Sequence, residues 1–159
     1  TEKAPVVGVS WHEAAAYARW AGKALPTEAQ WECAALRSAE GEAKLRFPWG
    51  ASYEAGAANL ADARAGAARP VGSFERDRSP AGCFDMAGNV REWTDDAYAA
   101  YPGSPCVDRK FGKGYVVVRG GSFEDDALTA RPSERRARLK ETRDRLTGFR
   151  CVWAPAATP

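Results

Sequence analysis

The spacing of apolar positions in the first part of the chain is helical. Ser10 to Glu13 has the pattern of a capping box and predicts a helix that ends near Gly22. Thr27 to Gln30 repeats this pattern and predicts a second helix that ends at about Arg37. Each helix has an apolar stripe of alanine and tryptophan, which we expect to face the core.

The pattern changes at residue 38. Between Ser38 and Gly82, glycine, proline and alanine interrupt short segments, which predicts long ordered loops with short strands. Loops of this length in a compact domain are usually functional or held by another group, such as an ion. Tyr115 to Arg119 is continuous and β-branched and predicts a central strand, and Thr147 to Trp153 predicts a closing strand.

Basic residues gather between these two predicted strands. Residues 131–145 carry six Arg and one Lys against two Glu and one Asp, a net charge of +4 by this count. Such a run, with Arg135 and Arg138, is typical of a solvated helix face. The alternative is a surface that binds an anion or a partner.

Composition limits the possible classes of protein. The 159 residues suit one domain, and the formal charge of +2 implies no strong attraction to nucleic acid or membrane. Six Trp, five Tyr, six Phe, 15 Gly and 10 Pro favour a loop-rich domain held by aromatic packing. No apolar run approaches the ~18 residues that span a bilayer. The chain starts without a signal-like segment, and the compartment, cytoplasm or export, stays open.

The cysteines and the histidine argue against a zinc site. The four cysteines form no CxxC pair and the one histidine is His12, which we expect on the surface of a first helical turn. Two disulfides and buried free thiols both remain open. The cysteines are Cys33, Cys83, Cys106 and Cys151.

The segment Asp85 to Trp93 combines two carboxylates with residues that favour a tight turn. Gly88 and Asn89 tolerate unusual backbone angles, so we expect a turn there that directs carbonyls inward. Carbonyl and carboxylate oxygens without thiolates or imidazoles suit calcium rather than zinc. The alternative is a polar turn that is capped by its carboxylates and anchored by Trp93.

Seven segments, taken together, carry a resemblance to one family. They are Pro5–Trp11, Leu25–Glu32, Phe47–Gly50, Pro70–Phe74, Asp85–Trp93, Arg119–Phe123 and Gly148–Cys151. In this order and spacing they resemble the formylglycine-generating enzyme, or sulfatase-modifying factor, family. The resemblance implies an α+β, C-type-lectin-like fold with two helices, a small twisted antiparallel sheet and long ordered loops. It also implies a domain over residues 1–154, without the family's opening strands, and a tail over 155–159.

The resemblance implies where calcium binds. In the family pattern, Asp85 and Glu92 supply side-chain oxygens, and Gly88 and Val90 supply backbone carbonyls. A second site is implied at Asn59 and the Leu60 carbonyl, with Asp62 as a further candidate.

The same comparison argues against the family's oxidation chemistry. Formylglycine-generating members hold copper with two cysteines, and the matching positions here are Asp125 and Ala130. Neither a carboxylate nor a methyl group replaces soft sulfur on Cu(I). We therefore predict that the chain does not generate formylglycine. Sulfoxide synthases with this fold bind iron through a histidine cluster, which His12 alone cannot form.

Two classes of function follow. The first is a non-catalytic, calcium-stabilised, lectin-like binding or sensory module, part of a larger bacterial signalling or surface protein. It would bind a protein or an anionic ligand through the Arg-rich loop 122–148. The alternative is an oxidoreductase of the formylglycine-generating or sulfoxide-synthase type, or an accessory half of one. Nucleic acid is the least favoured partner. The candidate surface residues are Phe123, Glu124, Asp125, Arg131, Arg135 and Arg136.

Overall fold

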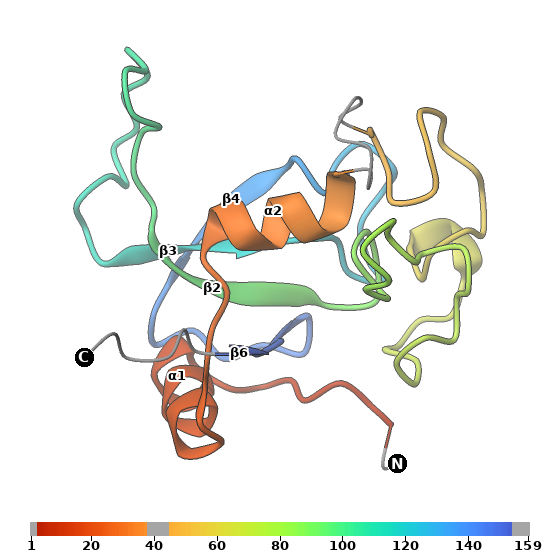
Figure 1. Cartoon of the computed structure of the whole chain (residues 1–159), viewed down its shortest axis with the longest axis horizontal. Helices are drawn as coiled ribbons and strands as arrows, with labels where there is room; N and C mark the ends of the chain where they lie inside the picture. The colour runs from red at the N-terminus through yellow and green to blue at the C-terminus, as the bar shows by residue number, and fades with distance from the viewer. Residues whose placement is uncertain (1–2, 38–44, 154–159) are drawn as a thin grey trace.

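The computed structural model describes residues 3–37 and 45–153, and the predicted tail at 155–159 lies outside them. Within these described residues, two short helices and six strands are joined by long loops (Figure 1). The elements follow in the order α1 (Trp11–Trp20), β1 (Lys23–Ala24), α2 (Glu28–Leu36), the 3-10 turn η1 (Ala61–Ala63), β2 (Arg91–Ala97), β3 (Tyr115–Arg119), β4 (Arg135–Leu139), β5 (Thr147–Phe149) and β6 (Val152–Trp153).

Both helices begin where their caps predict. The Ser10 hydroxyl accepts a hydrogen bond from the Glu13 amide, and the Glu13 carboxylate accepts one from the Ser10 amide at 2.8 Å. Thr27 and Gln30 make the same reciprocal pair in front of α2. The two capping boxes are therefore confirmed, because this signal is local in sequence.

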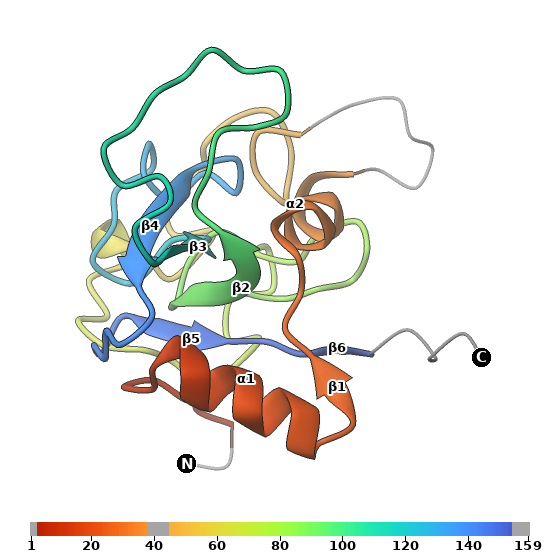
Figure 2. The same ribbon diagram turned by 90° about the vertical axis from the view of Figure 1, so that its left-hand side faces the viewer.

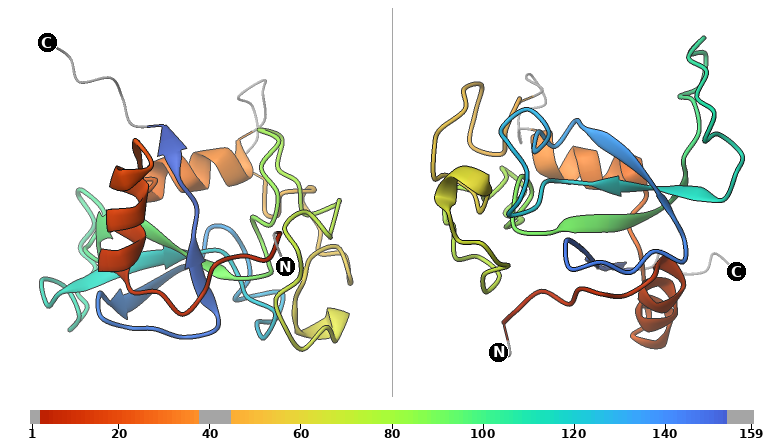
Figure 3. Two further views of the ribbon diagram at one scale, coloured as in Figure 1. Left: turned by 90° about the horizontal axis from the view of Figure 1, so that it is seen from below. Right: turned by 180° about the vertical axis from the view of Figure 1, so that it is seen from behind.

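The main sheet has the order β4-β3-β2-β5. The β4–β3 and β3–β2 pairs are antiparallel, as predicted, but β2 and β5 run parallel. The sheet is therefore mixed rather than purely antiparallel. The chain leaves β4, loops around residues 140–146 and returns beside β2, where Arg91 N–H donates to the Leu146 carbonyl at 2.8 Å (Figure 3).

The predicted closing strand over 147–153 is two strands in two sheets. β5 joins the main sheet, whereas β6 pairs with β1 in a separate two-stranded ribbon. In the loop-rich region, the described residues of 45–82 form isolated bridges, Phe47 with Gly50 and Arg78 with Phe84, in place of the short strands we expected.

The two helices cover opposite faces of the main sheet (Figure 2). The alanines of α1 pack against Trp93, Val116 and Val118. On the other face, Trp31 and Leu36 of α2 pack with Met86. A third cluster lies under the loops and joins four buried residues to Trp49. Its buried members are Ala58, Leu60, Ala87 and Ala130.

The Arg-rich segment contains a strand, not the helix face that its charge pattern suggested. β4 pairs residue by residue with β3, from Arg119 opposite Arg135 to Tyr115 opposite Leu139. Because side chains of a strand alternate between faces, Arg135 lies on one side of the sheet, and Arg136 and Arg138 lie on the other. Tertiary pairing with the valine-rich β3 overrides the local pattern here.

The four cysteines are free thiols. This settles the choice that the sequence left open between disulfides and free thiols. Within residues 3–37 and 45–153, no helix has the length and apolarity that crossing a bilayer requires.

Candidate functional site

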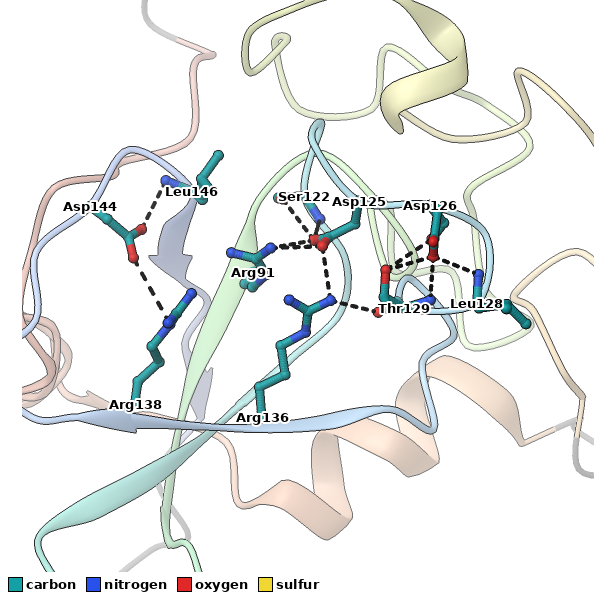
Figure 4. Close-up of polar contacts among 10 residues, drawn as sticks. All are labelled: Arg91, Ser122, Asp125, Asp126, Leu128, Thr129, Arg136, Arg138, Asp144 and Leu146. Carbon is teal, nitrogen blue, oxygen red and sulfur yellow. Dashed lines mark hydrogen bonds and ion pairs between the residues drawn. The ribbon is translucent and has the colours of Figure 1, made fainter. Parts of the chain in front are cut away.

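A buried ion-pair cluster surrounds Asp125, the first position that the family resemblance assigns to copper. The Nη2 atom of Arg91 lies 2.7 Å from each oxygen of the Asp125 carboxylate. Arg136 Nη2 donates to Oδ1 at 2.8 Å, and the Ser122 amide and hydroxyl donate to Oδ2 at 2.8 and 2.7 Å. Figure 4 shows Arg91 from β2 and Arg136 from β4 converging on this one carboxylate.

A tight turn after β3 brings Asp125 to this position. Gly120 has a φ of +76°, and a Cβ on Gly121 would overlap the Ala87 carbonyl, so both positions require glycine. The following turn closes when the Asp125 amide donates to the Ser122 carbonyl at 2.9 Å. Burial alone would raise the pKa of Asp125, but hydrogen bonds from Arg91 and Ser122 outweigh it and hold the pKa below its ordinary value.

Ala130, at the second copper position, is fully buried in the cluster beneath Trp49. The loop that leads to it is fixed by Asp126, whose carboxylate accepts from the amides of Leu128 and Thr129 at 3.0 and 2.8 Å (Figure 4). One copper position therefore holds a carboxylate inside an ion-pair cluster, and the other holds a methyl group inside the core.

The predicted ligand surface is only partly a surface. Phe123 has 4% of its area exposed, and Asp125 is also buried. The Phe123 amide donates to the Asn89 carbonyl at 3.0 Å, which draws this segment beneath the 85–90 turn, and the Arg145 guanidinium covers the ring at 5.2 Å from its centroid. The prediction that Phe123 and Asp125 are exposed ligand contacts is therefore wrong, because both residues are buried by contacts within the chain.

Most of the basic run has partners within the chain. Arg135 binds Glu28 of α2 through two hydrogen bonds of 2.8 and 2.6 Å, and its guanidinium lies 4.2 Å from the ring centroid of Tyr101. Glu28 and Tyr101, the two partners of Arg135, line a groove of about 710 Å³ along α2. The other pairs are Arg136–Asp125, Arg138–Asp144, Arg143–Glu13 and Arg145–Glu124.

Two candidates stay at the surface. Glu124 is exposed and pairs with Arg145, and Arg131 donates through Nε to the Leu128 carbonyl at 3.0 Å. Leu128, which the sequence did not single out, is 64% exposed at the tip of this loop.

The predicted calcium segment does form a tight turn. Its left-handed residues are Asp85 and Asn89, with φ values of 58° and 73°, rather than Gly88. Gly88 is required for a different reason: a Cβ there would lie 2.8 Å from the Asn59 carbonyl oxygen. The turn and the Asn59 segment therefore lie against each other, which brings the two predicted calcium positions together.

The two predicted carboxylate ligands differ in their surroundings. Within the described residues, hydrogen bonds reach Asp85 only at Oδ2, from the Gly72 amide at 3.0 Å and from Asn89 at 3.4 Å. Burial raises the pKa of Asp85, and these hydrogen bonds oppose the rise. A buried carboxylate with a free oxygen and no paired guanidinium suits a hard cation.

Glu92 already has a cation beside it. Arg150 donates to both of its oxygens, at 2.5 and 2.7 Å, and Trp31 Nε1 donates to Oε2 at 2.6 Å. Burial would lower the pKa of Arg150, but the Glu92 carboxylate reverses this effect and raises it. The charge of Glu92 is thus neutralised by the protein itself.

The predicted ligands of the second calcium site also differ in their surroundings. Asn59 donates through Nδ2 to the Ala67 carbonyl and to Asn89 Oδ1, both at 3.0 Å. Its own Oδ1 is buried and has no hydrogen-bond partner in the described part of the chain. The Leu60 carbonyl accepts from the Ala63 amide. Asp62 accepts from the Tyr53 hydroxyl at 2.6 Å and the Gly56 amide at 3.2 Å, and so braces its own loop.

Asp77 was missed by the sequence analysis. It is fully buried, and its carboxylate accepts from the amides of Ala87 and Gly88 at 2.9 and 3.0 Å, so it clamps the turn from behind. Burial, with a contribution from the Asp85 charge, raises its pKa to about 7 against the opposing backbone hydrogen bonds. Only its position eight residues before Asp85 in a polar loop could have suggested this role.

The donor set fits calcium in part. Asn59 has a buried oxygen to offer, and Asp85 has an oxygen that accepts no hydrogen bond from the described residues, whereas Glu92 is committed to Arg150. Among the residues that the structure describes, no three His, Cys, Asp or Glu side chains are grouped to share a metal. A cation here would therefore depend on backbone carbonyls, as hard calcium allows.

Comparison with known proteins supports the family resemblance that the seven segments carry. Residues 1–155 match the model of the sulfatase-modifying factor enzyme 1-like domain. The chain belongs to this family. It is 37% identical to a hercynine oxygenase of Mycobacterium tuberculosis over 94% of this chain and 36% of that protein. It is 39% identical to the serine/threonine-protein kinase pkn1 of Chlamydia pneumoniae over 94% of this chain and 24% of the kinase.

Solved structures of the family have the same fold. PvdO from Pseudomonas aeruginosa matches with a TM-score of 0.70 and 27% identity, over 92% of this chain and 60% of that one. The family assignment and the α+β fold with two helices are therefore confirmed. The chain spans about a quarter to a third of the two relatives above.

Proposed function

We propose that this chain is a non-catalytic recognition domain of the formylglycine-generating enzyme type, which works as part of a longer bacterial signalling or surface protein. The environment of Asp125 and Ala130 carries the proposal. Arg91, Arg136 and Ser122 together surround the carboxylate at one copper position, and the other position lies in the core. Cu(I) binds thiolates, and neither position offers one.

A protein ligand is better supported than a free anion. A small anion at the Arg-rich segment would have to displace Glu28, Asp125 or Glu124 from guanidinium groups that they already bind. A protein that contacts Leu128 and Arg131 would displace no carboxylate. Leu128 is exposed, and Arg131 donates to the backbone of its own loop. The preformed 126–131 turn would lose little conformational entropy when it binds.

Calcium has a structural role in this proposal. Asp85 and the carbonyls of Gly88 and Val90 would hold one ion, and Asn59 Oδ1 would offer a ligand at the neighbouring position. Bound calcium would neutralise the buried charge of Asp85 and would fix the turn against the Asn59 segment.

To test the proposed binding surface, we compare a substitution of an exposed apolar residue inside the 126–131 turn with a substitution of one outside it. Leu128→Asp should abolish capture of the partner from native extract, whereas Val107→Asp, on another loop and 90% exposed, should leave capture unchanged. The captured protein is then titrated against purified chain, with and without EGTA. Equal capture by the two variants and the unaltered chain would show that the 126–131 turn is not the binding surface.

The non-catalytic half is tested separately. Purified chain loaded with Cu(I) is incubated with a cysteine-containing peptide in air, and the peptide is examined by mass spectrometry. We expect no aldehyde. Aldehyde formation above a copper-only control would overturn the proposal.

A second candidate is the accessory domain of an oxygenase, and the identity with hercynine oxygenase favours it. His12, the one histidine, lies at the surface 3.8 Å from Glu141, so an iron site would need ligands from elsewhere in a longer polypeptide. Stoichiometric iron and hercynine-dependent oxygen consumption by the full polypeptide would support this candidate. Calcium alone, without oxygen consumption, would support the recognition domain.

A further inference from the structure

The groove along α2 has the size of a ligand site, and the function proposed above does not use it. Its volume is about 710 Å³, and sites for small ligands measure roughly 300–1,000 Å³. Residues of α2 and its two caps, from Thr27 to Arg37, line the groove together with Asp96, Tyr101 and Ser133. These last three come from the end of β2, the β2–β3 loop and the segment before β4.

Ion pairs hold the groove in shape. Glu28 accepts hydrogen bonds from Arg135 at 2.8 and 2.6 Å and from the Tyr101 hydroxyl at 3.1 Å. The buried guanidinium of Arg119 pairs with Glu32 and donates to the backbone before β4 at 2.9 Å. These bonds connect α2 to β3, β4 and the β2–β3 loop, so a ligand would lose little free energy in ordering the groove. Both glutamates are committed to arginines, and other groups must therefore recognise a ligand.

The remaining charged groups lie at the two ends of the groove. At the amino end of α2, one oxygen of the Asp96 carboxylate accepts from the Glu28 amide, and the other accepts no hydrogen bond from the described residues. At the carboxyl end, Arg37 is exposed and forms no ion pair within the described part of the chain. The lining between these ends is apolar and consists of Ala29, Cys33 and Leu36.

The distance between the two charged ends suits an extended peptide. α2 has nine residues, so its ends are about 13 Å apart. An extended chain advances about 3.3 Å per residue, and four residues cover the same distance. Positions i, i+2 and i+4 of such a chain point to one side. A basic residue at i would then face Asp96, an apolar residue at i+2 would face Cys33, and an acidic residue at i+4 would face Arg37.

We propose that the α2 groove binds an extended peptide segment in which a basic, an apolar and an acidic residue alternate with any other residues. The charges of the segment complement the two ends of the groove, and its central side chain covers the apolar middle. No residue of the 126–131 turn is among the described residues that line the groove, so this site is independent of the partner surface proposed above.

Two peptides of equal composition test the spacing. The probe is fluorescein-labelled Arg-Ser-Leu-Ser-Glu, and the control is Arg-Leu-Ser-Glu-Ser, whose two charges point to opposite sides. Fluorescence anisotropy with the 159-residue chain should show saturable binding of the probe with a Kd below about 1 mM. The control should bind at least about threefold more weakly, as the loss of one ion pair predicts. Equal affinity for the two peptides, or no saturable binding of the probe, would overturn the proposal.

Substitutions at the two ends test the charges. Asp96→Asn keeps an oxygen that can accept from the Glu28 amide but removes the negative charge, and Arg37→Gln removes the positive charge. Each should raise the Kd of the probe by about threefold or more. An unchanged Kd in both variants would show that the ends of the groove do not recognise the peptide.

Two exposed thiols locate the bound peptide. Cys33 lines the groove, whereas Cys106 lies on the β2–β3 loop and is not among the described lining residues. Saturating probe should slow alkylation of Cys33 by N-ethylmaleimide and leave that of Cys106 unchanged. Cys33→Trp should fill the groove and abolish binding, and Cys106→Trp is the matched control, which should bind normally. Unchanged alkylation of Cys33 would overturn the proposal. Protection of Cys33 without peptide that grows with chain concentration would also overturn it, in favour of a second copy as the occupant.

Discussion

Arg91 and Asp125 form a buried ion pair in which one guanidinium nitrogen lies 2.7 Å from both carboxylate oxygens. The Nε and Nη1 atoms of Arg91 are buried and have no hydrogen-bond partner among the described residues, so Asp125 is the group that compensates the charge of Arg91. The residue at a copper position of the family is therefore a structural counter-ion in this chain. Replacing Asp125 would therefore change the stability of the fold, whether or not it changed any chemistry.

Removal of Asp125 should destabilise the fold strongly. Asp125→Ala leaves the Arg91 charge buried and unpaired, and we expect a loss of about 3–5 kcal/mol in the free energy of unfolding, measured by urea denaturation. The double variant Arg91→Met/Asp125→Leu should lose less than Asp125→Ala alone. Glu124→Gln, which breaks an exposed pair with Arg145, is the control and should cost at most about 1 kcal/mol. A loss for Asp125→Ala no larger than this control would contradict the counter-ion role.

The same carboxylate should make stability depend on pH. Its folded pKa lies below the ordinary value, so the stabilisation is complete above the unfolded pKa of about 3.9 and is lost as pH falls through the folded pKa. The difference in unfolding free energy between the unaltered chain and Asp125→Asn should be constant from pH 5 to 7. It should shrink below about pH 4. A difference that grows on acidification would contradict the assignment. The two proteins share all other acidic groups, so the contributions of those groups cancel in this difference.

Restoring two cysteines should not restore copper chemistry. In Asp125→Cys/Ala130→Cys, the first thiol would lie beside Arg91 and Arg136, which favour the thiolate and lower its pKa. The second sulfur would enter a filled core next to Gly121, at a cost of about 1–3 kcal/mol. We expect a destabilised protein that forms no aldehyde on a cysteine peptide. Thiol titration, denaturation and peptide mass spectrometry measure these effects, and efficient peptide oxidation would show that only the two sulfurs were missing.

Local signals in the sequence were sufficient for part of the fold. The two capping boxes and the strand Tyr115–Arg119 depend on residues within one or two turns, and each lies where it was predicted. The parallel pairing of β5 with β2 was not predictable in this way, because the direction in which a strand returns depends on the path of the preceding loop.

The charged residues show why the candidate surface was harder to predict. Counting charges over residues 131–145 gives a basic segment, but two of its acidic partners lie far away in sequence. Arg135 binds Glu28 across 107 residues, and Arg143 binds Glu13 across 130. The same holds for Glu92 and Arg150, which are 58 residues apart. Long-range ion pairs leave no periodic pattern in the sequence. A run of solvated charges and a run of charges that are paired within the chain therefore have the same sequence pattern.

Calcium should stabilise the chain through Asp85 rather than through Glu92. Saturating calcium, at about 100 times its Kd, should add about 2.7 kcal/mol and raise the Tm. Asp85→Asn should abolish this rise, because it removes a buried carboxylate whose Oδ1 is free. Glu92→Gln should lower the Tm equally with calcium and with EGTA, since it breaks the pair with Arg150, and should keep the rise. Asp126→Asn, in an exposed turn outside both predicted calcium sites, is the matched control and should keep the rise. Differential scanning fluorimetry measures all four proteins. If Glu92→Gln loses the rise and Asp85→Asn retains it, the carboxylate ligand is Glu92, and Arg150 must release it when calcium binds.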